Sequence, residues 1–232
     1  MGRSSSPKIR QSRFGQDENA HSELLLQNVL GAISTAQLLV TFLSVGVSNI
    51  KWADALLADF NSLDGLLAAP AEKLLAVQGL GRARVLRLKA VYALSLRHAE
   101  QELDKPAAMA NPAQVIRYLR LRIGHIEREI FGCLYLDACH RPISWDELFL
   151  GSLNRAHVYA REILKRGLAL NAGAIVLSHN HPSGAAEPSS ADVELTRELK
   201  DLLARVDIVV LDHIIVTPDD SVSMANRGLL AP

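Results

Sequence analysis

Two histidines and one aspartate stand close together in the segment 178–192, at a spacing that suits metal chemistry. His179 and His181 follow an apolar run, residues 174–177, that is typical of a short buried strand. Because side chains two positions apart on an extended segment point to the same side, both imidazoles can face one point in space. Asp192 returns toward them from the first turn of a predicted helix. Three such ligands, with a position left for water, are typical of a catalytic zinc site.

The same stretch also permits a simpler interpretation. Ser189 followed by Asp192 is a helix-start pattern, with Ser189 as the N-cap residue and an acidic residue in the first turn. The two interpretations are compatible, because a helix start holds Asp192 in a fixed place. The His-x-His pair at this distance favours the metal site.

The spacing resembles the zinc signature of the JAMM (JAB1/MPN) metalloprotease family. In that signature His-x-His-Pro is followed by six residues, Ser, two residues and Asp, and this sequence fills the fixed positions with His179, His181, Pro182, Ser189 and Asp192. The longer motif His-Asn-His-Pro-Ser-Gly is similar to the RadC branch of the family, and so are the stretches 210–216 and 226–230. The likeness is specific over residues 111–230 and weaker over residues 22–97.

The resemblance implies roles for further residues. It implies Glu129 as the general base that takes a proton from water, with Glu127 as the rival; Glu129 is preferred because its register with Gly132 matches the family's pattern. Ser189 is implied as the hydroxyl that stabilises the oxyanion. The resemblance also implies one zinc ion per chain, held by His179, His181 and Asp192.

Composition and charge describe a protein of two ordinary domains. The 232 residues are 49% hydrophobic and 22% charged, which is typical of a globular protein, and their net charge of zero excludes bulk electrostatic binding of nucleic acid. Cys133 and Cys139, without a secretory signal, predict reduced thiols and a cytoplasmic location. The apolar stretch 30–47 is interrupted by polar residues, so it predicts a buried helix and no membrane contact.

The chain divides into four predicted segments. They are a disordered tail over 1–21, an all-helical domain over 22–100, a linker over 101–111 and a JAMM-like domain over 112–232. In the last segment, helical patterns begin at 112, 157 and 189, and strand patterns cover 130–136, 143–150, 174–177 and 208–217. The predicted fold class is therefore α/β, a mixed sheet flanked by helices and preceded by a small all-α domain.

A glycine turn is the informative part of the helical segment. Gly79-Leu80-Gly81 lies between two helical patterns and resembles the helix-hairpin-helix motif, whose glycines let the backbone approach a phosphate. Arg82 and Arg84 add positive charge there. An ordinary helix-to-helix turn before a solvated basic helix explains these residues equally well. Val85 stands where the motif usually has a small residue, and Arg82 where RadC sequences often have proline.

The leading hypothesis is a zinc metallopeptidase that hydrolyses an amide or isopeptide bond in a peptide substrate. The alternative is a DNA-repair or recombination factor that binds DNA through the Gly79–Arg84 turn and carries a structural or vestigial metal site. A zinc nucleobase deaminase is disfavoured, because the His-x-Glu and Pro-Cys-x-x-Cys motifs are missing. His213, within an apolar strand pattern, is interpreted as a core histidine, and Asp212 as a weak candidate for orienting a ligand histidine.

Overall fold

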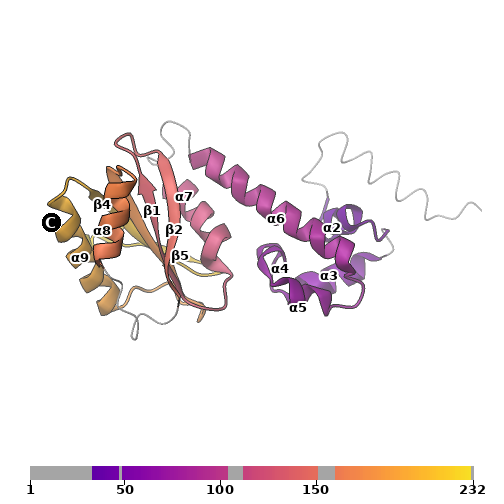
Figure 1. Cartoon of the computed structure of the whole chain (residues 1–232). Coiled ribbons are helices and arrows are strands. Elements are labelled where there is room, and N and C mark those ends of the chain that lie inside the picture. The colour runs from indigo at the N-terminus through magenta and orange to yellow at the C-terminus, as the bar shows by residue number, and fades with distance from the viewer. Residues whose placement is uncertain (1–32, 47–48, 104–111, 151–159, 231–232) are drawn as a thin grey trace, which may run out of the picture.

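The computed structural model describes residues 33–46, 49–103, 112–150 and 160–230 (Figure 1). The predicted tail and the predicted linker from residue 104 onward lie outside these ranges. A helical region precedes a five-stranded mixed sheet with helices on its faces, which confirms the predicted fold class. Among the described helices, none combines the length and apolar character needed to cross a bilayer.

The helical region contains five described helices. They are α2 (Thr35–Leu43), α3 (Ile50–Asp59), α4 (Leu63–Ala68), α5 (Ala71–Leu75) and α6 (Arg82–Leu103). Polar caps fix several of their starts: the Ser34 hydroxyl accepts from the Gln37 amide, and the Ser62 hydroxyl accepts from the Gly65 amide. Aliphatic side chains from all five helices form one buried cluster, so this region has a core of its own.

Helix α6 belongs to both halves of the molecule (Figure 1). Val85 and Leu88, near its start, are buried in the core of the helical region, whereas Ala99 and Leu103, near its end, are buried against the sheet. The helix ends at Leu103, whereas the sequence predicts that a linker begins at residue 101. One continuous helix thus connects the two halves, and apolar side chains at each of its ends are buried in the adjoining core.

The sheet domain, residues 112–230, alternates helices and strands. In chain order these are α7 (Pro112–Leu119), the π-helical turn η4 (Arg120–Gly124), β1 (Ile130–Leu136), β2 (Pro142–Leu150), α8 (Ala160–Ala169), β3 (Ala174–Asn180), α9 (Ser190–Ala204), β4 (Val209–Val216) and β5 (Ser221–Ser223). The strand order is β2-β1-β3-β4-β5, in which β3 and β4 are parallel and the other neighbours are antiparallel.

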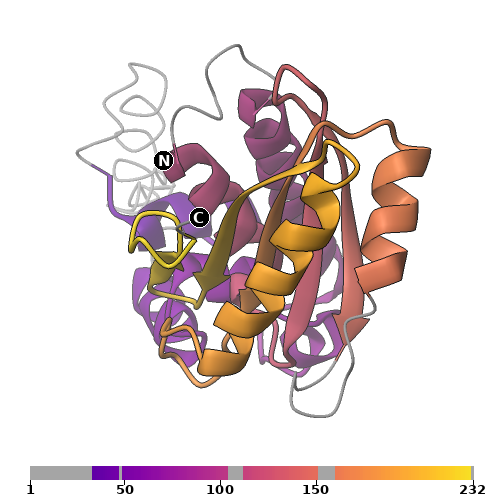
Figure 2. The same cartoon turned by 90° about the vertical axis from the view of Figure 1, so that its left-hand side faces the viewer.

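The alternation of side chains along the strands separates two cores. Ile130 and Leu134 of β1 face α7 and the end of α6, whereas Phe131 and Tyr135 face α8 and α9. Figure 2 looks onto the face that α8 and α9 cover. In β3, His179 shares the α9 face with Phe131, since their rings stack with centroids 6.3 Å apart. The sheet thus directs the histidines toward the N-terminus of α9.

Gly132 on β1 provides a test of this packing. A methyl group at Gly132 would lie 2.3 Å from Cζ2 of Trp145 on β2, so Gly132→Ala must displace the indole. We expect a loss of about 1–3 kcal/mol in the free energy of unfolding, measured by urea denaturation. In a Trp145→Ala background, which removes the ring, the same substitution should cost less. An equal cost in both backgrounds would contradict this packing explanation.

Candidate metal centre

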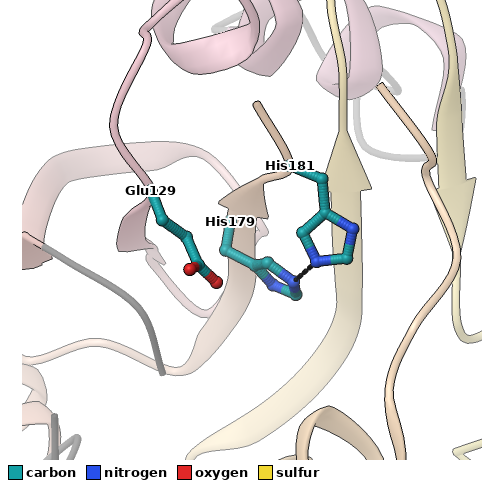
Figure 3. A group of neighbouring side chains, drawn as sticks. All are labelled: Glu129, His179 and His181. Atoms are coloured by element: carbon teal, nitrogen blue, oxygen red, sulfur yellow. Dashed lines mark hydrogen bonds between the residues drawn. The ribbon is translucent and has the colours of Figure 1, made fainter. Parts of the chain in front are cut away.

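The residues with the metal-binding pattern meet at one end of the sheet. His179 is the penultimate residue of β3 and His181 follows its end, while Glu129 immediately precedes β1. Figure 3 shows the Glu129 carboxylate and the two imidazoles directed toward a common space. One ligand atom from each of these three residues lies within 4.8 Å of the others, so together they could hold a metal ion. His179 is fully buried, and His181 and Glu129 are half-buried.

Asp192 approaches His179 from the start of α9. Its Oδ2 accepts from the backbone amide of Ser189 at 2.7 Å and from the Ser189 hydroxyl at 2.6 Å, which completes a capping box. Its Oδ1 is buried without a hydrogen-bond partner and lies 3.5 Å from Nε2 of His179. A buried carboxylate oxygen without a partner is unfavourable unless a cation or a donor occupies the space beside it.

The proton on His181 is located by a backbone carbonyl. Nδ1 of His181 lies 2.7 Å from the carbonyl oxygen of Ala185, which can only accept a hydrogen bond. Nδ1 therefore carries the proton. In the neutral ring this leaves a lone pair on Nε2, the form in which an imidazole binds a metal.

The proton on His179 is located by a longer hydrogen-bonded chain. The Thr196 hydroxyl donates to the backbone carbonyl of Asp192 at 2.5 Å, so its oxygen accepts from Nδ1–H of His213 at 2.6 Å. Nε2 of His213 must then accept from Nδ1–H of His179 at 2.8 Å. This order leaves the lone pair of His179 on Nε2 as well.

Both histidines consequently present lone pairs to the same point. Their Nε2 atoms are 2.9 Å apart (Figure 3), a distance at which two unprotonated nitrogens repel unless a positive centre lies beside them. Burial lowers the pKa of His179 to about 4; Asp192 opposes this shift and His181 adds to it. His179 is therefore neutral near pH 7. The two nitrogens and the Glu129 carboxylate are close enough to hold a metal ion, whereas Asp192 lies outside that group of three and approaches it through Oδ1, 3.5 Å from Nε2 of His179.

Two residues that contact this centre, His213 and Thr196, were not assigned to it from the sequence. His213 is a fully buried and hydrogen-bonded core histidine, as its position in an apolar strand indicates, but its partners are His179 and Thr196. Burial lowers its pKa well below the usual range, with His179 and His181 adding to the effect. Asp212 binds the Ser223 hydroxyl and the backbone amides of His213 and Ala225, and so does not orient a ligand histidine.

The residues predicted for nucleic-acid binding lie in the helical region. Gly79 has a φ of +93°, a conformation that favours glycine, and it packs beneath the indole of Trp52. Gly81 and Arg82 are exposed at the start of α6. Arg84 donates to the carbonyl oxygens of Gly79 at 2.6 Å and Leu43 at 3.1 Å, so its side chain holds the turn together.

Comparison with known proteins finds many relatives of this chain. A family model described as "RadC-like JAB domain" matches residues 109–229. A UPF0758 protein of Stutzerimonas stutzeri is 46% identical over 209 residues, which cover 89% of this chain and 93% of the relative. A UPF0758 protein of Azotobacter vinelandii is also 46% identical, over 211 residues that cover 90% of this chain and 94% of the relative. Because that shared name specifies no reaction, the chemistry has to come from the site itself.

The hydrogen-bonded chain behind His179 predicts the effect of Thr196→Val. Valine keeps the shape but removes the oxygen that accepts from His213, so the His179 proton is no longer held on Nδ1. We expect zinc affinity to fall about 10–100-fold, measured by competition with a chromogenic chelator.

Thr217→Val is the matched control for this variant. It also removes a buried threonine hydroxyl, one whose hydrogen bonds, within the described part of the chain, go to Asp220 and not to an imidazole. If both substitutions lower zinc affinity equally, the hydrogen-bonded chain does not support the metal centre.

Proposed function

Because the chain belongs to the RadC family and carries its RadC-like JAB domain, we propose that it is a zinc-dependent hydrolase of amide or isopeptide bonds. One observation carries the proposal: the Nε2 atoms of His179 and His181 lie 2.9 Å apart, and the buried, unpartnered Oδ1 of Asp192 lies 3.5 Å from Nε2 of His179. Two nitrogens and one oxygen suit zinc and leave a coordination position for water, as in catalytic zinc sites.

His179, His181 and Asp192 would hold the ion, with Asp192 binding through Oδ1 because Oδ2 is engaged by the cap. Bound there, zinc would supply a Lewis acid that polarises the scissile carbonyl and acidifies water. Glu129 is assigned as the general base rather than a further ligand. Its carboxylate takes the proton of the attacking water and passes it to the leaving nitrogen, so that the amine departs neutral.

Ser189 is assigned to the oxyanion that forms on the scissile carbonyl. Its side chain lies in the exposed loop before α9, where a substrate can reach it, but the hydroxyl now donates to Oδ2 of Asp192 at 2.6 Å. The Ser189 backbone amide also binds Oδ2, at 2.7 Å. The amide can therefore keep Asp192 in place while the hydroxyl turns to donate to the substrate.

Glu129→Gln tests the assignment of the base. Glutamine keeps the size of the side chain but cannot take a proton at neutral pH, so hydrolysis should fall by at least about 10²-fold. Zinc content, measured by mass spectrometry of the purified protein, should stay at one ion per chain, whereas His179→Ala and Asp192→Ala should lower it. The activity assay is a panel of peptide and isopeptide-linked substrates, run with zinc and with a chelator.

Two results would contradict these assignments. Full activity of Glu129→Gln would remove Glu129 from the mechanism, and a loss of zinc from Glu129→Gln would make this residue a ligand instead. A wild-type protein that never retains zinc would remove the mechanism as a whole.

Nucleic-acid binding is a second proposed function, favoured by a pocket at the start of α6. Arg82, Arg84 and Arg87 line this pocket, next to the N-terminal amides of the helix. Two of these side chains also hold the fold: Arg84 binds the carbonyl of Gly79, and Arg87 binds the Ser44 hydroxyl at 3.1 Å. Arg82 is therefore the residue whose removal tests binding without disturbing the turn.

Arg82→Ala in the full chain is expected to weaken binding to duplex DNA without sequence preference. The slope of log affinity against log salt should flatten by about 0.9 for one lost phosphate contact. Arg97→Ala, an exposed arginine farther along the same helix, is the control and should leave the slope unchanged. Absence of binding at low salt, or equal effects of the two variants, would reject this function.

A further inference from the structure

Asn180 lies between the two candidate ligand histidines and points away from them. It is the last residue of β3, and because side chains alternate along a strand, it faces the side of the sheet opposite to His179. Asn180 is fully buried. A buried amide needs hydrogen-bond partners, and the partners of this one lie in the segment that carries Glu129.

The Asn180 amide makes three hydrogen bonds to the backbone on both sides of Glu129. Its Oδ1 accepts from the amide of Ile130 at 2.7 Å. Its Nδ2 donates to the carbonyl oxygens of Ile126 at 2.9 Å and Arg128 at 3.0 Å. All three partners are backbone groups, and they fix the orientation of the amide, since the reverse would oppose donor to donor and acceptor to acceptor.

Backbone pairing between β1 and β3 begins only beyond this point. The first pair in their register is Phe131 with His179, so this ladder does not extend to residues 126–129. The Asn180 side chain continues the connection past the end of the ladder. The ion pair between Lys73 and Glu127 also reaches this segment, but both side chains are more than half exposed, and such pairs contribute little.

We propose that Asn180 is a positioning residue that fixes Glu129 relative to the metal ligands. The inference rests on the proposed function, in which Glu129 is the base. The residues before and after Glu129, Arg128 and Ile130, are held by one amide, and the chain neighbours of that amide are His179 and His181. The Asn180 side chain thus joins the segment that carries the base to the strand that carries the ligands. Aspartate, serine or alanine at this position cannot make all three bonds.

The test compares Asn180→Ala and Asn180→Asp with wild type. Alanine removes all three bonds, whereas aspartate keeps an acceptor for Ile130 and loses both donors, so it serves as the second variant if alanine prevents folding. Ser178→Ala is the matched control, because Ser178 is equally buried on the same face of β3 and its hydroxyl binds the Ile214 carbonyl at 2.7 Å. Each protein is loaded with zinc and checked for folding by circular dichroism.

Two measurements do not depend on activity. Hydrogen exchange of the Ile130 amide should become faster in Asn180→Ala, because its acceptor is lost, and remain slow in Ser178→Ala. Zinc content should stay at one ion per chain in both Asn180 variants, because the three hydrogen bonds of the Asn180 side chain go to backbone groups of residues 126–130 and not to the proposed ligands. Unchanged exchange at Ile130, or a loss of zinc from either variant, would overturn the proposal.

The kinetic measurement is a double-mutant cycle with Glu129→Gln. Asn180→Ala should lower kcat about 10²-fold and leave KM unchanged, since misplacement of a catalytic group by about 1 Å has an effect of this size. In the Glu129→Gln background the same substitution should have no further effect. An equal loss in both backgrounds would show that Asn180 does not act through Glu129.

The outcomes separate this inference from the proposed function. If wild type hydrolyses no substrate, or if Glu129→Gln is fully active, the proposed function fails. The exchange and zinc measurements then still decide whether Asn180 holds the 126–130 segment against the ligands.

Discussion

Two imidazole lone pairs that face each other across 2.9 Å are the constraint on which the rest of the site depends. Such a pair is unfavourable in a dry interior unless a cation lies beside it. It persists here because each ring is fixed from behind: His181 by the Ala185 carbonyl, and His179 by the chain through His213 and Thr196. The chain ends at the backbone carbonyl of Asp192, so the third candidate ligand also helps to orient the first.

The end of β3 serves two purposes because a strand has two faces. His179 faces α9 and approaches Asp192, whereas Ser178 and Asn180 face the other way and bind backbone atoms of β4 and of the segment before β1. The histidines are thereby free for a metal, while the neighbouring side chains tie their strand to both adjacent strands. Rigid support of this kind keeps a site near its productive geometry without a contribution from the reacting side chains themselves.

The sequence predicted the family, the fold class and the segment that carries the histidines, because these follow from local patterns. Spacing placed His179, His181 and Asp192 near one another, and the structure has them so, although their roles as ligands remain predictions. The supporting contacts were missed, since they depend on pairing between distant segments. His213 reaches His179 only because β4 lies parallel to β3, and no local pattern reveals that neighbour. Likewise, α6 continues to Leu103 because the sheet domain buries that side chain.

The way Asp192 is held favours the proposed catalytic metal over a structural one. A structural site is usually closed by four protein ligands, and its geometry forms only when metal drives folding. Here the Asp192 carboxylate is fixed by the capping box of α9, and both imidazoles are fixed by hydrogen bonds. The protein's own hydrogen bonds therefore fix the positions of all three side chains. Support from α9 and from the sheet, rather than from a bound ion, is what the proposed catalytic site would need, because a catalytic metal leaves a coordination position open.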